Sequence, residues 1–556
     1  MLNHYRLKWI VNSVAILSAI AHFGAKLSST VYPRINSDML YMPAVIKDII
    51  SPHYTTTHWA FPGAPYQFPD LVFYAPLYAM TGNIAQAHAA ITLLFLFIQC
   101  MLVAWLACLL LSPHHQTHRT FLLLLSVVLF HSVLFWQPAF MSPLLEPVTH
   151  SGAAWIALLC IGLLFKGSPS VSPTLKIGVF FLVAATSFSD RLFLLNFTFP
   201  VLTVGLFLWV WRRTWFRLYL SAFVIAGLAS LVGWGCSYLW PWGISANLPY
   251  HKGGLGMFWS KTLLFVSLVR KDFHWGMALF ALLTTGGIVY AFLQWRRALQ
   301  EVSESEPPSL AILWPILFFI PVLTFTGTMA SGFYQDWAGS RYLFAANLIL
   351  LLFPLTALLH VFHRFVFVPN NRVALLFVIG VVMGGVGVYT GDLKPTFHYQ
   401  PARVRAMDRL QKKYGLRHGL ATYWYAKELS LFSSTGLWAN AVTKAGNVYP
   451  WVTNLQWYAR PPNSQGKVRY NFILVDPSMD VFLVSDKYGP PHKVLWVGNN
   501  RLFLYPEQNG IQREIQEDLW MIDPHSFPHP SPQNKSLRPS TQPSSEKHHS
   551  RTRGNK

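Results

Sequence analysis

Apolar residues along this chain gather in long blocks that are separated by short polar segments. A helix needs roughly 20 residues to cross the hydrocarbon core of a membrane, and about eleven blocks approach that length. The blocks lie at residues 8–25, 88–111, 120–136, 153–165, 175–188, 194–211, 218–240, 275–295, 310–330, 342–362 and 373–390. This pattern predicts an α-helical polytopic membrane protein.

Two stretches between the blocks, residues 27–87 and 241–274, are too long to be simple connections. The first predicts a short helix at 39–50 and a second apolar segment at 71–80, which is too short to span and is expected to be interfacial or re-entrant. In the second, an apolar stretch at 258–271 ends in two basic residues. Such a stretch is suited to lying at the lipid headgroups.

The character of the chain changes after the last block. Residues 392–523 predict a small soluble α/β domain, large enough to bury its own core. Beyond it, residues 524–556 are rich in His, Pro, Ser, Gln and Lys and contain almost nothing apolar, which predicts a disordered tail. The elements expected in the domain are a helix at 403–414, a strand at 470–475 and a hairpin at 494–505.

Composition supports the membrane class. Hydrophobic residues make up 53% of the chain and charged residues only 12%. A formal charge of +21 is also typical of nucleic-acid binding, but much of the basic excess lies in short loops and in the tail, where membrane orientation explains it better. No nucleic-acid partner is therefore expected. All four cysteines lie in apolar blocks, which leaves no disulfide framework or Cys-based zinc site outside the bilayer.

The basic residues also indicate the orientation. If the N-terminus is cytoplasmic, every inner loop carries Lys or Arg, whereas the outer loop 138–150 has none. The outer loops 189–192 and 331–341 have only Arg191 and Arg341. This asymmetry fits the positive-inside rule, and with an odd number of spans it places the C-terminal domain outside the cytoplasm.

Charged residues at the outer ends of membrane helices are costly to hold and tend to be functional. Asp38, shortly after the first block, is the leading candidate for a general base, because a partly desolvated carboxylate is more basic than one in water. An alternative is that Asp38 only caps the helix that follows it. The full set of such residues is Asp38, Asp48, Asp70, Glu146, Asp190, Arg191, Lys252, Lys261, Asp336 and Arg341.

The outer loops also contain histidines and a glutamate that are able to bind metal, namely His53, His58, Glu146 and His150. Their spacing does not correspond to any ligand set for zinc. The sequence therefore predicts no metal site and no cofactor.

Two short motifs and the topology carry a family resemblance. Asn36-Ser37-Asp38 lies in the long first outer loop, and Gly339-Ser-Arg-Tyr-Leu343 lies where a helix begins at the outer face. With these features, residues 1–391 resemble the GT-C superfamily of membrane glycosyltransferases, which includes protein O-mannosyltransferases, aminoarabinose transferases and bacterial relatives. Many members have paired acidic residues, whereas Asp38 has no acidic neighbour. This departure argues against a metal-dependent version of the reaction.

The resemblance implies a sugar donor linked to polyprenyl phosphate, held among membrane lipids, in a bacterial inner membrane. The hexose or pentose would pass by inverting displacement to a lipid, glycan or protein acceptor outside the cytoplasm. Asp38 would be the base; the lipid phosphate would bind to Arg341, Arg191 and Lys261; and the sugar would contact Tyr41, Trp59, Asp190 and Tyr342. As alternatives, Asp190 and Arg191 form a local ion pair, and Arg341 only extends to the membrane interface.

Two further functional classes stay open on the sequence. Many spans with scattered polar residues also suit a transporter, although the halves show no repeat and no charged residue lies deep in a span. A non-catalytic scaffold of GT-C type, whose outer domain binds a partner, is the third class.

Overall fold

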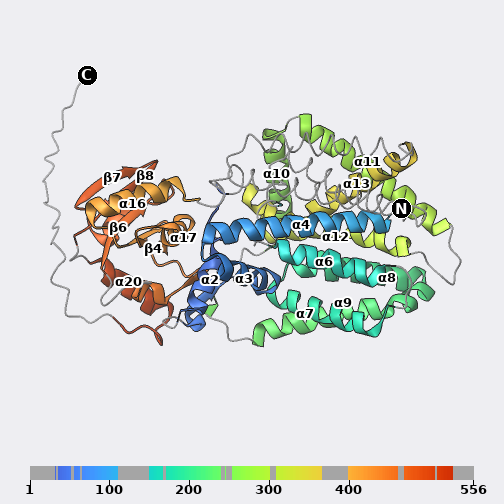
Figure 1. Cartoon of the computed structure of the whole chain (residues 1–556), viewed down its shortest axis with the longest axis horizontal. Coiled ribbons are helices and arrows are strands. Elements are labelled where there is room, and N and C mark those ends of the chain that lie inside the picture. The colour runs from blue at the N-terminus through green and yellow to red at the C-terminus, as the bar shows by residue number, and fades with distance from the viewer. Residues whose placement is uncertain are drawn as a thin grey trace, which may run out of the picture.

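The computed structural model describes residues 32, 35–51, 55–62, 65–110, 144, 150–166, 171–239, 244–245, 253–273, 275–300, 309–365, 399–460, 469–506 and 510–529. Within these residues, a bundle of long helices adjoins a C-terminal unit built on a sheet, and α2 lies between the two (Figure 1). The spans predicted at 8–25, 120–136 and 373–390 lie outside the described residues, as does the tail from residue 530 onward.

Five helical stretches in the described part are long and apolar enough to cross a membrane: Ile84–Leu110, Leu194–Trp211, Arg213–Leu239, Leu310–Ser331 and Gly339–Leu358. The prediction of a mostly helical protein with candidate membrane spans is thereby confirmed, and the number of eleven spans stays a prediction. The bundle is formed by α4 (Ile84–Leu110), α6 (Ser151–Phe165), α7 (Pro173–Ser189), η7 (Leu194–Thr198), α8 (Phe199–Trp211), α9 (Arg213–Leu239), α11 (Trp275–Gln300), α12 (Ser309–Ser331), η8 (Trp337–Leu343) and α13 (Phe344–Phe365).

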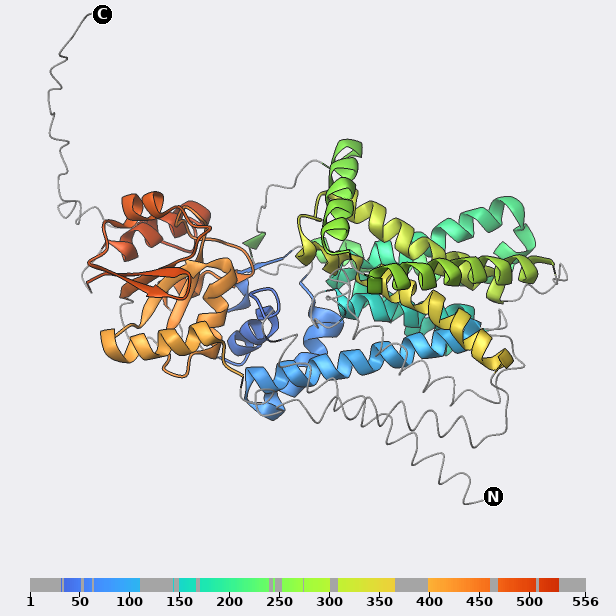
Figure 2. The same ribbon diagram turned by 90° about the horizontal axis from the view of Figure 1, so that it is seen from above.

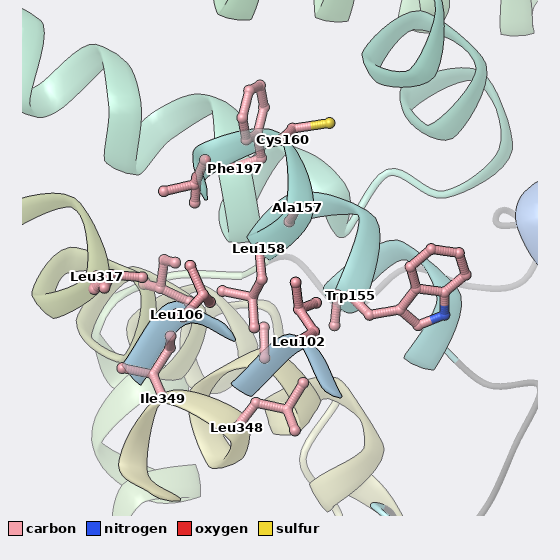
Figure 3. Close-up of a cluster of buried hydrophobic side chains, with 14 of the residues drawn as sticks. Leu102, Leu106, Trp155, Ala157, Leu158, Cys160, Phe197, Leu317, Leu348 and Ile349 are labelled. Carbon is pink, nitrogen blue, oxygen red and sulfur yellow. The ribbon is translucent and has the colours of Figure 1, made fainter. Parts of the chain in front are cut away.

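The bundle helices share one continuous apolar core (Figure 3). Leu106 of α4, Leu158 of α6 and Ile349 of α13 meet in it, and all three are fully buried. α7 and α9 approach so closely that a Cβ atom at Gly233 would stand 2.0 Å from the carbonyl oxygen of Ala184. Small residues at such crossings allow membrane helices to pack backbone against backbone.

α10 (Leu255–Lys271) differs from the bundle helices in exposure and direction. None of its residues is buried, and it runs across the direction of α4 and α11 in both views (Figures 1 and 2). A helix that lies across the other helices with basic residues at its end is compatible with a place at the lipid headgroups, and that place stays a prediction for 258–271. Lys261 lies on α10 and is half-buried.

The stretch predicted to be the first outer loop is folded into short elements. They are α2 (Tyr41–Ile49), η3 (Thr56–His58), β1 (Trp59–Phe61), η4 (Gln67–Leu71) and α3 (Val72–Thr81). α2 coincides with the helix expected at 39–50, and most of its residues are buried. A solvated loop helix would keep one polar face exposed, so this burial identifies α2 as a packing element between the bundle and the C-terminal unit.

The C-terminal unit is a five-stranded mixed sheet in the order β4-β3-β6-β8-β7. β3 pairs in parallel with β4 and β6, whereas β8 is antiparallel to β6 and β7. Phe472 and Leu474 of β6 face the cluster that contains α16 and α17, and Ile473 and Val475 face α19 and α20. The elements are α16 (Ala402–Tyr414), β3 (His418–Thr422), α17 (Tyr423–Phe432), β4 (Trp438–Val442), α18 (Gln456–Ala459), β6 (Tyr470–Val475), α19 (Val481–Tyr488), β7 (Lys493–Val497), β8 (Asn500–Leu504) and α20 (Ile511–Ile522).

A second, three-stranded sheet joins the first outer loop to the C-terminal unit. In the order β2-β1-β5, it combines β1 with β2 (Ile244–Ser245) from the second long loop and β5 (Thr453–Asn454) from the C-terminal unit. Beside it, the buried carboxylate of Asp48 accepts hydrogen bonds from Trp59 Nε1 at 2.9 Å, Trp457 Nε1 at 3.0 Å and Asn454 Nδ2 at 2.7 Å. Asp48 is therefore a polar anchor between the first outer loop and the C-terminal unit.

The stability of this anchor depends on pH. Burial raises the pKa of Asp48 to about 6, although its three N–H donors oppose the shift. The folded protein holds this proton up to a higher pH than the unfolded chain, so the free energy of unfolding falls as the pH rises from about 4 to about 6. The effect amounts to roughly 3 kcal/mol at most.

We expect the melting temperature of the wild-type protein to fall, relative to that of Asp48→Asn, between about pH 4 and pH 6. Other titrating groups contribute equally to both proteins and cancel in the difference. Asp486→Asn, an exposed aspartate of the C-terminal unit, serves as the matched control and should follow the wild type. Parallel pH profiles for the wild type and Asp48→Asn would contradict the assignment.

Candidate active site

Asp38 lies in the turn that precedes α2, where its backbone is fixed by a neighbouring side chain. The Asn36 Oδ1 atom accepts hydrogen bonds from the amides of Asp38 at 3.0 Å and Met39 at 3.2 Å. α2 begins at Tyr41, and its N-cap residue Leu40 makes no side-chain capping bond. The alternative that Asp38 caps this helix is therefore wrong, and its carboxylate is left for other partners.

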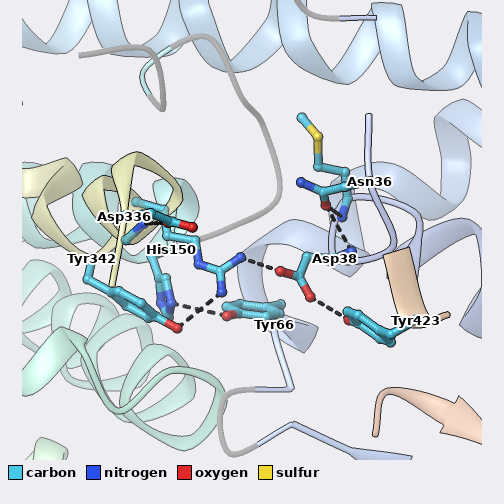
Figure 4. Close-up of polar contacts among 10 residues, drawn as sticks. Asn36, Asp38, Tyr66, His150, Asp336, Tyr342 and Tyr423 are labelled. Atoms are coloured by element: carbon cyan, nitrogen blue, oxygen red, sulfur yellow. Dashed lines mark hydrogen bonds and ion pairs between the residues drawn. The ribbon is translucent and has the colours of Figure 1, made fainter. Parts of the chain in front are cut away.

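Those partners come from two distant parts of the chain (Figure 4). Oδ2 of Asp38 accepts from Nη1 of Arg341, which is 303 residues away, and Oδ1 accepts from the Tyr423 hydroxyl, 385 residues away. About 15% of the Asp38 side chain is exposed. The contact thus joins the first outer loop, the start of a membrane helix and the C-terminal unit at one carboxylate.

The environment lowers the pKa of Asp38. Burial alone would raise it, but the Arg341 guanidinium, the hydrogen bond from Tyr423 and the nearby Lys427 ammonium together outweigh burial. The expectation that partial desolvation makes Asp38 more basic is therefore wrong for this state of the site. Asp38 is a carboxylate held in its ionised form by its neighbours.

Arg341 is positioned by η8, the short helix that leads into α13. Its Nη2 atom donates to the Tyr342 hydroxyl at 3.2 Å, and its Cζ atom lies 5.1 Å from the centre of the Tyr342 ring. The Arg341 Nε atom is buried and, within the described residues, has no hydrogen-bond partner. The guanidinium therefore keeps unused capacity to bind an anion in addition to Asp38.

Tyr423 and Lys427 are contributed by α17, which follows the parallel strand β3. The backbone carbonyl of Tyr423 accepts from Ser37 Oγ, so the helix start is attached to the Asp38 turn twice. Lys427 is 4% exposed, and its Nζ atom lies 4.4 Å from the centre of the Tyr423 ring. Burial lowers the pKa of Lys427 to about 7 against the opposing field of Asp38.

A second polar chain lies on the side of this cluster that faces the helical bundle (Figure 4). His150 shares hydrogen bonds with the Tyr66 hydroxyl at 3.1 Å through Nε2 and with Asp190 Oδ2 at 2.7 Å through Nδ1. The His150 and Tyr342 rings have their centres 5.1 Å apart, which connects the two networks. Asp190 thus pairs with His150, and the alternative of a local Asp190–Arg191 ion pair is wrong.

The other predicted phosphate ligands lie elsewhere. The guanidinium of Arg191 is 5.0 Å from the centre of the Tyr238 ring, at the end of α9. Lys261 lies on the surface helix α10. Within the described part of the chain, neither forms an ion pair or a hydrogen bond with Asp38 or Arg341.

Tyr41 and Trp59, expected to contact the sugar, are packing residues in this structure. Trp59 is fully buried, stacks on Phe61 and donates to Asp48. Tyr41 is 1% exposed, and its hydroxyl donates to the Pro65 carbonyl at 2.9 Å. Neither ring presents a face to a ligand, because the C-terminal unit covers the loop that carries them. Among the expected sugar contacts, Asp190 and Tyr342 lie in the polar networks beside Asp38.

Carboxylates and histidines do not cluster as a metal site in the described ranges. Among those residues, no group of three or more His, Cys, Asp or Glu side chains is arranged to hold an ion. The polar networks instead combine one carboxylate with cations and hydroxyl groups, a set suited to acid–base chemistry and anion binding.

Comparisons with known proteins find similarity in structure but not in sequence families. No protein-family model and no curated protein sequence matches the chain. The similar solved structures include the crystal structure of ArnT from Cupriavidus metallidurans bound to undecaprenyl phosphate. It shares 11% sequence identity and a TM-score of 0.46, over 90% of this chain and 98% of that chain. A likeness at this level assigns neither an activity nor a ligand to the chain.

Proposed function

We propose that the protein is a membrane glycosyltransferase that moves a sugar from a polyprenyl phosphate donor to an acceptor hydroxyl outside the cytoplasm. The observation that supports this most directly is the cluster of Asp38, Arg341 and Tyr423. It lies between the helical bundle and the C-terminal unit, where a lipid-borne group at the membrane surface and a soluble acceptor are able to meet.

In the proposed reaction, Asp38 accepts the proton of the acceptor hydroxyl as the acceptor oxygen forms a bond to the anomeric carbon of the sugar. The bond between that carbon and the phosphate oxygen breaks, and its electron pair leaves with the phosphate. Arg341 stabilises the growing negative charge on the phosphate through its paired N–H groups. A single displacement inverts the anomeric centre and needs no enzyme nucleophile.

Binding of the sugar donor would also activate the base. Arg341 is the first of the groups that hold the pKa of Asp38 down against burial. When a phosphate recruits this guanidinium, Asp38 loses part of that stabilisation, and its pKa rises. The proton acceptor therefore becomes more basic only when the sugar donor is in place.

An apolar cavity in the bundle supports a substrate with a long hydrocarbon chain. It has a volume of about 550 Å³ and is lined by residues of α8, α11, α12 and α13, including Phe207, Trp314 and Phe353. Phe353 of α13 follows Arg341 of η8 by twelve residues, which is roughly 18 Å at the usual helical rise. A lipid whose phosphate binds Arg341 would reach this cavity with its chain.

The remaining assignments are part of the same proposal. Tyr342 and the pair of Asp190 with His150 lie on the bundle side of the cluster and would contact the sugar. Lys261 on α10 and Arg191 would attract the phosphate from the membrane surface. The C-terminal unit would lie outside the cytoplasm of a bacterial cell, with the acceptor a lipid, a glycan or a protein.

The proposal is tested with the full-length protein reconstituted in liposomes. A panel of polyprenyl phosphate hexoses and pentoses is supplied with cell-envelope extract as the acceptor source, and released polyprenyl phosphate is measured. We expect release that depends on the protein and on the acceptor. Uptake of a soluble solute without release would support a transporter, and neither activity would support a scaffold; both results contradict the proposal.

Tyr423→Phe tests the hydrogen bond that the C-terminal unit supplies to the base. Its hydroxyl stabilises the ionised form of Asp38, so its loss raises the pKa of Asp38. We expect the acidic limb of the pH–rate profile to move upward by roughly 1–2 pH units. Tyr425→Phe, two residues along α17, is the matched control. An unmoved acidic limb would contradict the role of this hydrogen bond.

A further inference from the structure

The buried amine of Lys427 has no use in the reaction described so far. Lys427 is 4% exposed, and its Nζ atom finds no hydrogen-bond partner among the described residues. A buried ammonium without a partner is costly, because each of its three N–H donors has lost water. The Nζ atom of Lys427 lies over the face of the Tyr423 ring, 4.4 Å from the ring centre.

The charges around the amine are already paired. Arg341 neutralises Asp38, and Arg403 of α16 pairs with Glu428 at 3.3 Å. Among the described residues around Asp38, Lys427 is therefore a cation that forms no ion pair with a carboxylate. A site that combines a neutral ion pair with one uncompensated cation attracts an anion.

The Tyr423 ring links this amine to the proposed reaction centre. Its hydroxyl donates to Asp38 while its face contacts Lys427. One tyrosine side chain thus contacts both groups, the carboxylate of Asp38 through its hydroxyl and the amine of Lys427 through its ring face. The amine sits on a flexible four-carbon stem, which allows it to move toward a ligand at Asp38 without any shift of α17.

We propose that Lys427 binds the phosphate of the lipid-linked sugar donor opposite Arg341, so that the C-terminal unit supplies one of its two cationic ligands. This inference rests on the proposed function, which provides the phosphate. The lowered pKa of Lys427 agrees with it, since an incoming anion compensates the burial that disfavours the ammonium. The sugar donor would then bind only where bundle and C-terminal unit are assembled.

A structural role is the competing explanation. A cavity of about 10 Å³ beside Lys427, lined among others by Ser430, Asn440 and Trp457, has room for one water molecule. Such a water would satisfy the amine without any ligand. If Lys427 binds the phosphate, its charge strengthens phosphate binding. If its role is structural, its charge has no specific effect on phosphate binding.

Binding of two lipid probes separates these explanations. Full-length protein in detergent is titrated with polyprenyl monophosphate and, separately, with the uncharged polyprenol. We expect Lys427→Met and Lys427→Gln to weaken binding of the phosphate at least tenfold and to leave binding of polyprenol unchanged. Lys412→Met, which removes an exposed lysine of α16, should bind both probes like the wild type.

Each other outcome counts against the inference. Unchanged phosphate affinity in folded Lys427→Met and Lys427→Gln overturns the role of Lys427 while leaving the proposed function intact. Equal weakening for both probes, or a lower melting temperature with unchanged selectivity, assigns Lys427 a structural role. If the wild-type protein binds polyprenol as tightly as polyprenyl monophosphate, it does not recognise the lipid phosphate. That result overturns both proposals.

Discussion

The Asp38→Asn variant is expected to transfer sugar roughly 10²- to 10⁴-fold more slowly than the wild-type protein, which is the usual contribution of a general base. Asparagine has nearly the same shape and can still accept from the Tyr423 hydroxyl or the Arg341 guanidinium. It cannot accept the proton of the acceptor. The loss should therefore appear in the catalytic rate more than in the affinity for the sugar donor.

The size of this effect is measured as initial rates of polyprenyl phosphate release at saturating sugar donor. Asp486→Asn removes an exposed carboxylate of the C-terminal unit and should retain wild-type rates. A melting temperature close to that of the wild type would show that Asp38→Asn is folded. Wild-type rates in a folded Asp38→Asn protein would contradict the assignment of Asp38 as base.

The Arg341→Met variant is expected to lose both activity and stability. It removes the cation at the leaving phosphate, and transfer should fall roughly 10²-fold or more. It also leaves the Asp38 carboxylate largely buried without its ion-pair partner. Breaking a fully buried pair costs about 3–5 kcal/mol, and the partial exposure of this pair reduces the expected loss to roughly 1–3 kcal/mol.

A second substitution separates the two losses. Asp38→Asn in the Arg341→Met background removes the unpaired charge, so stability should partly recover while transfer stays low. Arg409→Met, which removes an exposed arginine of α16, is the matched control for charge. Rates close to the wild type in Arg341→Met, or a double variant no more stable than Arg341→Met, would contradict the ion-pair account.

Hydrophobic periodicity was sufficient to predict much of this fold. Long apolar blocks have few structural alternatives to helices, and α4, α8, α9, α12 and α13 lie where such blocks occur. The strand expected at 470–475 coincides with β6, since six consecutive buried residues form a strand that is covered on both faces. The helix expected at 403–414 is α16, which ends at Gly415 with a positive φ of 65°.

The relation between the first outer loop and the C-terminal unit was not predictable in this way. Trp59 looked like a loop aromatic available for a sugar, yet β1 pairs with β5 and the ring is buried against Trp457. Strands of two or three residues leave no periodic pattern in a sequence. Their pairing depends on tertiary contacts between segments about 400 residues apart, which the local sequence does not encode.

Only the part of the candidate site outside the C-terminal unit was accessible to sequence reasoning. Asp38 and Arg341 are isolated charges at the ends of apolar blocks, where a charge is conspicuous. Tyr423 and Lys427 lie in an ordinary amphipathic segment of the C-terminal unit, where tyrosine and lysine are common. The one available signal was their place after β3, since residues that follow a parallel strand are often functional. That signal requires knowledge of the sheet.

The most direct test of the account is a single-turnover reaction with a radiolabelled polyprenyl phosphate sugar bound to excess protein in liposomes. The account predicts that, once acceptor is added, the wild-type protein converts the bound sugar donor to free polyprenyl phosphate and a glycosylated product. Asp38→Asn should hold the same sugar donor intact over that time. Conversion by a folded Asp38→Asn protein at the wild-type rate, or no conversion by the wild type with any sugar of the panel, would contradict it.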